Sequence, residues 1–218
     1  MNKSKVEKIV YLVRHGQSEA NISPVFQPPE SPLTETGKKQ AKRIAERMSK
    51  LDFGILISSP LVRAKETSGA IASATGKKPE YSDLFVERIK PTSVSGKPHS
   101  DEEASNLWDE WERSLYTPDL RVEDGENFDD LIARADKALN FLKSKKEREI
   151  VVVTHGFFLR AVIARVVMSG SLTPEGFKSF LAHIYTENTG LSVLTYGKTS
   201  NGAAWRLWIY NDHAHLAD

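Results

Sequence analysis

Residues 9–19 read Ile9-Val10-Tyr11-Leu12-Val13-Arg14-His15-Gly16-Gln17-Ser18-Glu19, and this stretch decides the fold. Its first five residues are apolar and mostly β-branched, which predicts a short, fully buried strand of a parallel sheet. The run stops at Arg14, His15 and Gly16, at the carboxyl edge of the predicted sheet, where open α/β folds bind ligands. Two interpretations stay open on this stretch alone: Arg14 and His15 bind a ligand, or they only solvate a strand end.

A second stretch repeats this arrangement later in the chain. Residues 149–156 read Glu149-Ile150-Val151-Val152-Val153-Thr154-His155-Gly156, again a β-branched run stopped by a histidine and a glycine. The segment that follows, residues 157–168, is apolar on almost all sides and predicts a buried helix.

A third apolar run, residues 53–57, is followed by Ser58, Ser59 and Pro60. This order predicts a helix N-cap followed by a proline at the first helical position. Arg63 then falls in the first turn of a helix that begins at the carboxyl end of a strand. An arginine there opposes the helix dipole, and such a local conflict often marks a functional site.

The rest of the chain alternates between helical and extended patterns. Thr34 predicts the N-cap of a helix, and further helices are expected over residues 101–115 and 128–142. Residues 81–87, ending in Glu87, are interpreted as another strand. Loops are expected at residues 20–32 and 88–99. The final strands, at residues 191–196 and 205–210, are expected to form a hairpin through Ser200-Asn201-Gly202.

This alternation of strands and helices predicts an α/β fold. We expect a three-layer α/β/α sandwich with a mostly parallel central sheet. No linker divides the sequence, so residues 1–218 are predicted to form a single domain.

The composition narrows the classes of partner. Thirty Lys and Arg against 29 Asp and Glu give a net charge of +1, which supplies no argument for nucleic acid or a membrane surface. The absence of cysteine excludes disulfides, thiol nucleophiles and cysteine-based zinc sites. No apolar run reaches membrane-spanning length, and residues 1–8 lack the apolar core of a signal peptide. We therefore expect a cytoplasmic enzyme.

The candidate functional residues follow the predicted strands. Arg14, His15, Arg63 and His155 would converge at one sheet edge, with Glu87 as a further candidate. Arginine forks match the oxygens of phosphate, so this set predicts a site for a multiply charged anion. A lone carboxylate among cations suits a proton donor to a leaving group.

A metal site is the alternative for the histidines, but clustered arginines would repel a cation and no pair of carboxylates supports it. We therefore expect neither a metal nor a cofactor. The sequence contains no Walker-type phosphate loop, no dinucleotide fingerprint and no nucleophile elbow. Without these motifs and without cysteine, a histidine is the best remaining nucleophile.

The sequence resembles the histidine phosphatase superfamily, the phosphoglycerate-mutase-like group. Residues 12–21, Leu-Val-Arg-His-Gly-Gln-Ser-Glu-Ala-Asn, look like its signature. The resemblance continues through residues 33–41, 58–67, 125–127 and 153–156, and through Asn188 and the C-terminal residues. It covers nearly the whole chain in the right order.

The resemblance implies that His15 attacks phosphorus and carries a phosphohistidine intermediate. It also implies that Arg14, Arg63 and His155 hold the phosphoryl oxygens. Such preorganised electrostatics is usually the largest catalytic contribution. Glu87 would protonate the leaving oxygen and then activate water.

Four further residues are expected to bind the substrate. Asn21 would contact the phosphoryl group or the substrate, and Gln17 and Gly156 would line the same pocket. Gly16, lacking a side chain, would let the phosphate approach closely.

The match is weakest around Glu87. The acid stands one position later than in the family pattern, and Asp83 is the nearby alternative. The Glu-Arg-x-Tyr-Gly element and the paired-arginine segment of phosphoglycerate mutases are absent, which favours a phosphomonoester hydrolase. The alternatives are a phosphoglycerate-mutase-type phosphotransferase and a non-catalytic phosphate-binding module. The substrate, a small phosphorylated molecule, and the oligomeric state are not specified by the sequence.

Overall fold

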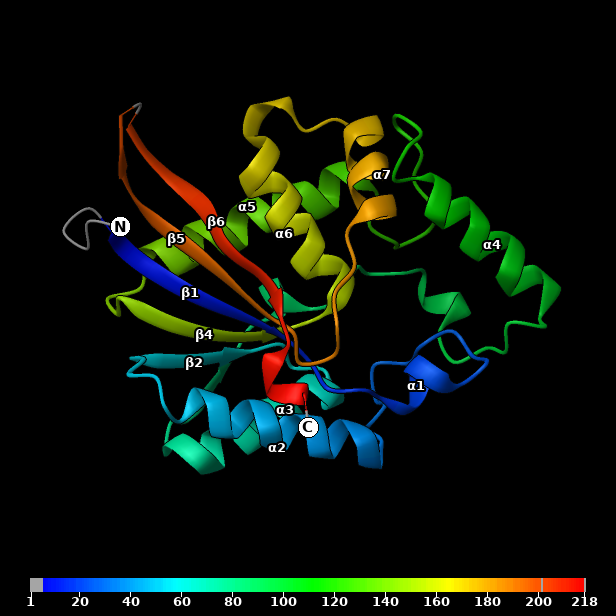
Figure 1. The fold of residues 1–218 in the computed structure, drawn as a ribbon. Helices are drawn as coiled ribbons and strands as arrows, with labels where there is room; N and C mark the ends of the chain where they lie inside the picture. The colour runs from blue at the N-terminus through cyan, green and yellow to red at the C-terminus, as the bar shows by residue number, and fades with distance from the viewer. Residues whose placement is uncertain (1–5, 201, 218) are drawn as a thin grey trace.

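A computed structural model describes residues 6–200 and 202–217, whose six strands form one central sheet (Figure 1). The strand order is β3-β2-β4-β1-β5-β6. The strands are β1 (Val6–Arg14), β2 (Ile55–Ser58), β3 (Pro79–Tyr81), β4 (Glu149–Thr154), β5 (Leu191–Thr199) and β6 (Gly202–Asp212). β1 to β4 pair in parallel, and β5 runs antiparallel to both of its neighbours. The predicted mostly parallel sheet is confirmed.

The strands that carry the site residues lie at the centre of the sheet. β1 pairs with β4 on one side and β5 on the other, which explains why its residues Val10, Leu12 and Val13 are buried. In register, Arg14 lies opposite Thr154, and Ser58 lies opposite Val153. The carboxyl ends of β1, β2 and β4 are therefore level with one another.

Helices cover both faces of the sheet (Figure 1). One hydrophobic cluster joins sheet residues with α2 (Glu35–Met48) and α3 (Val62–Thr75). The other joins the sheet with α5 (Phe128–Ser144) and α6 (Gly156–Met168). Two cores on opposite faces confirm the predicted three-layer α/β/α sandwich.

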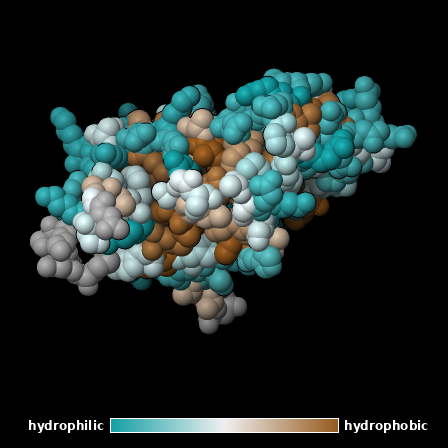
Figure 2. Space-filling model, turned by 90° about the horizontal axis from the view of Figure 1, so that it is seen from above, coloured by the Kyte–Doolittle hydropathy of each residue, from teal (hydrophilic) through white to brown (hydrophobic). Residues whose placement is uncertain are grey.

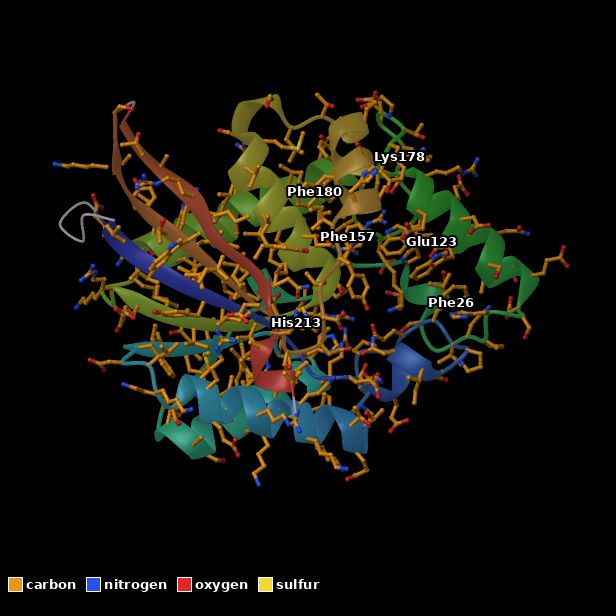
Figure 3. All side chains as sticks on the ribbon, viewed as in Figure 1. Phe26, Glu123, Phe157, Lys178, Phe180 and His213 are labelled. Atoms are coloured by element: carbon orange, nitrogen blue, oxygen red, sulfur yellow. The ribbon has the colours of Figure 1, made fainter. Side chains whose placement is uncertain are left out.

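A smaller layer, here called the cap, lies beyond the carboxyl ends of the strands (Figure 1). It consists of α1 (Glu19–Ile22), residues 23–33, residues 91–101 and α4 (Glu102–Arg113). Its core holds Phe26, Val94 and Ala104. The backbone N–H of Phe26 donates to the Lys97 carbonyl at 2.9 Å, which ties the two loops together. Figure 3 shows Phe26 in this region, between α1 and α4.

Two local predictions were wrong. Residues 81–87 are not a strand: β3 ends at Tyr81, and a 3₁₀ turn, η2 (Asp83–Phe85), follows. The Ser82 hydroxyl accepts from the Leu84 N–H, and the Phe85 carbonyl accepts from Thr154 Oγ1 at 2.8 Å, so the chain turns into the core there. The N-cap of α3 is Leu61, without a side-chain hydrogen bond, rather than Ser59.

Other predictions held or were incomplete. The Thr34 hydroxyl accepts from the Gly37 N–H, as expected of an N-cap. The hairpin of β5 and β6 is confirmed, although Asn201 of its turn lies outside the described residues, as does most of the segment 1–8. The helix α7 (Pro174–His183) was not predicted from the sequence. The remaining short turns are η3 (Thr92–Val94), η4 (Ser169–Ser171) and η5 (Ala214–Leu216).

The surface is mixed in character. Figure 2 shows hydrophobic residues exposed over the middle of one face, with hydrophilic residues around them. Val167 and Trp208 are examples of large apolar side chains that are more than half exposed. Across residues 6–200 and 202–217, no helix has the length and apolar character needed to cross a membrane.

Candidate active site

The structure brings four of the predicted residues together at the carboxyl edge of the sheet. We call Arg14, His15, Arg63 and His155 the clamp. Arg63 Nε donates to His15 Nε2 at 3.3 Å, and the rings of His15 and His155 lie 5.0 Å apart between centroids. Each residue stands at a strand end or just beyond one: Arg14 ends β1, Arg63 opens α3 after β2, and His155 joins β4 to α6.

The backbone of β1 at the clamp is fixed from both sides. The His15 N–H donates to the Thr154 carbonyl at 2.9 Å. On the other side, Asn188 Nδ2 donates to the His15 carbonyl at 3.0 Å, and the Thr189 N–H donates to the Arg14 carbonyl at 3.0 Å. The position of His15 therefore depends on two segments distant in sequence.

The hydrogen bonds of His15 define which ring nitrogen carries the proton. Nδ1 lies 2.7 Å from the Gly16 carbonyl, which can only accept, so Nδ1 is the protonated nitrogen. Nε2 accepts from Arg63 and therefore carries the lone pair. Burial, followed by the charges of Arg63 and Arg14, holds the pKa of His15 well below its usual value. The imidazole is neutral, as a nucleophile must be.

His155 is oriented by a serine that the sequence pattern had suggested as a helix cap. His155 Nε2 lies 2.7 Å from Ser59 Oγ, which also accepts from the Leu61 N–H at 3.3 Å. Among the described residues, His155 Nε2 is the one acceptor recorded for the Ser59 hydroxyl proton, so Ser59 donates to Nε2 and the proton of the imidazole lies on Nδ1. Burial, and then Arg63, lowers the pKa of His155 well below its usual value.

Within the part of the chain that the structure describes, three buried polar atoms of the clamp have no hydrogen-bond partner: Arg14 Nε, Arg63 Nη1 and His155 Nδ1. Buried polar groups are nearly always paired, so each unpaired one requires an explanation. All three are N–H donors, and two belong to guanidinium groups. Donors of this kind fit the oxygens of a phosphoryl group.

Glu87 lies beside the clamp despite the wrong strand prediction for its segment. Its carboxylate accepts from the Phe158 N–H at 2.9 Å and from the Phe157 N–H at 3.2 Å, in the first turn of α6. Burial lowers the pKa of the Arg63 guanidinium to about 10, and the charge of Glu87 partly opposes this shift. A cavity of about 1180 Å³ has both Arg63 and Glu87 in its wall.

A buried ion pair holds the segment that carries Glu87. Arg134 of α5 forms two short bonds with the Glu126 carboxylate, at 2.6 and 2.7 Å. The same guanidinium donates to the carbonyls of Leu84, Val86 and Glu87 at 2.9 to 3.2 Å. The sequence analysis did not identify Arg134; Glu126 appeared only within the family-like Gly125-Glu126-Asn127 element.

Gly16 and Gly156 both lie close to atoms of other residues. A Cβ on Gly16 would lie 2.6 Å from the Gly37 carbonyl oxygen, and the Gly16 N–H donates to Thr67 Oγ1 at 3.1 Å. The close approach of Gly37 by itself therefore requires a glycine at position 16. A Cβ on Gly156 would lie 3.0 Å from Arg14 Nε, so this glycine makes room for the guanidinium.

Gln17 and Asn21 use their side-chain oxygens in the protein scaffold. Gln17 Oε1 accepts from Thr34 Oγ1 at 2.8 Å. Asn21 is exposed on α1, and its Oδ1 accepts from the Ser18 N–H at 2.9 Å. Among the described residues, neither of these two side-chain oxygens forms a hydrogen bond with a clamp residue.

The alternative acid Asp83 is exposed at the start of η2. Within the described ranges, no group of three or more His, Asp or Glu side chains is arranged to hold a metal ion.

Comparison with known proteins places these observations in a family. A relative from Enterobacter sp. (strain 638), named probable phosphoglycerate mutase GpmB, is 34% identical over 168 residues, which are 72% of this chain and 74% of the relative. Two solved structures share the fold. The α-ribazole phosphatase of Shigella flexneri has a TM-score of 0.75 at 20% identity, covering 94% of this chain and 96% of that one.

The second structure is the phosphoserine phosphatase of Entamoeba histolytica, solved with 3-phosphoglyceric acid. Its TM-score is 0.73 at 23% identity, over 96% of this chain and all of that one (100%). A model of the histidine phosphatase superfamily (branch 1) matches residues 10–210. The protein therefore belongs to the histidine phosphatase superfamily.

Proposed function

We propose that the protein is a phosphomonoester hydrolase that acts through a phosphohistidine at His15, without a metal ion or cofactor. The observation that carries the proposal is the arrangement at His15. Its Nδ1 is tied to the Gly16 carbonyl, and its Nε2 holds a lone pair beside Arg63. These hydrogen bonds support Nε2 as the nucleophile, and the three clamp N–H donors without a partner among the described residues support a phosphoryl group beside it.

The proposed reaction has two steps. In the first, His15 Nε2 attacks phosphorus, the bond to the alcohol oxygen breaks, and Glu87 gives its proton to that oxygen. In the second, Glu87 takes a proton from water, the resulting hydroxide attacks phosphorus, and the N–P bond breaks to release phosphate. Arg14, Arg63 and His155 offset the charge that develops on the phosphoryl oxygens.

Gln17 and Asn21 fit this proposal through their side-chain NH2 groups. Their carbonyl oxygens already accept hydrogen bonds from Thr34 and Ser18. We assign both NH2 groups to the substrate or its phosphoryl group. Gly156 contributes indirectly, because it allows Arg14 to lie against the start of α6.

Phosphotransfer between positions of a phosphoglycerate is the second candidate, since the relative named above is called a mutase. It shares the first step, and differs in returning the phosphoryl group to a substrate instead of to water. The absence of the mutase elements from the sequence favours hydrolysis.

The proposal is tested by trapping the intermediate. Brief incubation with a ³²P-labelled phosphomonoester and a denaturing quench should leave acid-labile label on His15. His15→Ala should carry no label and lose turnover. Label on another residue of the active protein would overturn the mechanism. If the protein converted a phosphoglycerate into its isomer and released no free phosphate, its activity would be that of a mutase and the proposed hydrolase activity would be wrong.

A further inference from the structure

The cavity beside the clamp is far larger than a phosphoryl group requires. It measures about 1180 Å³, which is slightly above the usual range for small-molecule sites. Arg63, which donates to His15, stands in its wall together with Glu87. The alcohol part of a phosphomonoester held at the clamp would therefore extend into this space.

Apolar side chains from four separate segments form much of the wall. They include Leu61, Val86, Ile89, Trp108 and Phe157. Figure 3 shows Phe157 between the start of α6 and α4. Ile89 is 43% exposed and lines the cavity, so its side chain is free to contact an apolar group there.

The aromatic part of the wall is held rigidly. Trp108 stacks on Phe26 with ring centroids 4.8 Å apart, and it meets Trp111 edge-on at 4.7 Å. Trp111 Nε1 in turn donates to the Glu126 carbonyl at 3.1 Å, and the Arg88 guanidinium lies 3.6 Å from the Trp111 ring. Trp108 thus presents a fixed, half-buried face to the cavity.

Charge in the wall beyond Arg63 and Glu87 is balanced. Four cations and four anions line it: Arg88, Lys90, Arg134 and Lys137 against Asp83, Glu112, Glu126 and Asp130. Arg88 pairs with Glu112 at 3.0 Å, and Arg134 with Glu126 at 2.6 Å. Lys90 Nζ already donates to the Gln27 carbonyl at 2.5 Å. A second anionic group on a substrate would therefore find no net positive field here.

We propose that the site takes phosphomonoesters of alcohols that carry an aromatic or extended apolar group, which packs against Trp108, Ile89 and Phe157. This inference rests on the proposed phosphomonoesterase function and names its substrate class. Small substrates with a second negative charge, such as phosphoglycerates, are disfavoured because they carry no apolar group to pack against the wall and because the charges of the wall balance one another.

The test compares primary alkyl phosphates of similar intrinsic reactivity. The probes are 2-phenylethyl phosphate, glycerol 3-phosphate and 3-phosphoglycerate, with phosphate release as the readout. We expect kcat/KM for 2-phenylethyl phosphate to exceed that for glycerol 3-phosphate by roughly tenfold to hundredfold, as burial of an apolar group predicts. 3-Phosphoglycerate should be the poorest of the three.

Substitutions in the cavity wall test whether these residues determine the preference for apolar substrates. Trp108→Ala and Ile89→Asp should each lower the ratio of kcat/KM for 2-phenylethyl phosphate to that for glycerol 3-phosphate by about tenfold. Ile89 is exposed, so Ile89→Asp tests the wall without disturbing the core. Trp208→Ala, on β6 and 54% exposed, is the matched control and should keep the wild-type ratio.

The outcomes separate this inference from the function on which it rests. Equal or faster turnover of glycerol 3-phosphate, with label still trapped on His15, would overturn the substrate class and leave the hydrolase standing. A preserved ratio in both Trp108→Ala and Ile89→Asp would also overturn it. Failure of every ester to label His15 would instead overturn the proposed function.

Discussion

The two ring nitrogens of His15 differ because their hydrogen-bond partners differ. The Gly16 carbonyl fixes the proton on Nδ1, and Arg63 turns its Nε–H toward the lone pair of Nε2. The same logic applies to His155, where Ser59 fixes the proton on Nδ1. In each histidine, one hydrogen bond selects the tautomer that the proposed reaction needs: His15 donates to a backbone carbonyl, and His155 accepts from a hydroxyl.

Glu87 is the residue whose assignment is most open to test. Glu87→Gln keeps an acceptor for the Phe158 N–H but cannot transfer a proton. Esters with poor leaving groups should lose about 10²- to 10⁴-fold in kcat, and aryl esters with good leaving groups much less. A Brønsted plot of rate against leaving-group pKa measures this.

Asp83→Asn is the matched control, since Asp83 lines the same cavity but is exposed. Equal slowing of all esters by Glu87→Gln, or a leaving-group effect in Asp83→Asn, would move the role to another acid.

The candidate residues at the clamp could be predicted because each stops a β-branched run or opens the helix after one. Parallel strands then guarantee a common edge. Ser59 was missed as a contact of His155 because Ser-Ser-Pro also suits a helix cap. The packing of Gly16 against Gly37 depends on two backbones more than 20 residues apart in sequence, which no local pattern encodes.

At the scale of elements, α5 and α6 act together on the segment around Glu87. The start of α6 donates two N–H groups to the carboxylate, and Arg134 of α5 holds three carbonyls of residues 84–87. The sequence predicted both helices but placed Glu87 on a strand. The turn at residues 83–85 depends on contacts with Thr154 and Arg134 that arise only in the folded chain.

Arg134→Lys tests this arrangement. A lysine keeps the charge opposite Glu126 but cannot reproduce the planar fork. The loss of several buried hydrogen bonds should lower the free energy of unfolding by about 2–3 kcal/mol, measured by urea denaturation.

Arg165→Lys is the control on the neighbouring helix, because Arg165 pairs with a more exposed carboxylate, that of Asp136. It should cost less than about 1 kcal/mol. Equal losses in the two variants would mean that Arg134 has no special part in holding the Glu87 segment.

At the scale of the whole molecule, the three layers and the mostly parallel sheet were the most predictable features, because apolar periodicity extends over entire elements. α7 was missed for the opposite reason: only one of its residues, Phe177, is buried. The cap was predicted only in pieces, as loops and one helix. Its small core joins residues 26, 94 and 104, a contact that exists only at long range.

The buried histidines make the stability of the fold depend on pH. In the folded protein the pKa values of His15 and His155 lie well below 6.5, whereas in the unfolded chain they are near 6.5. The unfolded state therefore binds more protons below pH 6.5, and stability falls as the pH falls. Burial also lowers the pKa of His215 to about 4, which acts in the same direction.

Between pH 7.0 and 5.5, His15 and His155 together should remove about 2–3 kcal/mol from the free energy of unfolding. Urea denaturation at a series of pH values measures the slope. His155→Gln should reduce the slope by the contribution of one histidine. A flat profile over this range would show that the imidazoles take up protons in the folded state.

The bonds that fix His15 also set an order of events during synthesis on the ribosome. His15 is translated well before the groups that hold its backbone, which belong to Thr154, Asn188 and Thr189. β1 itself needs β4 and β5 as neighbours before it is buried. A nascent chain therefore carries an exposed, unpositioned histidine until residue 189 has left the exit tunnel. The proposed phosphoryl chemistry can therefore begin only after residues 188 and 189 have been translated and folded against His15.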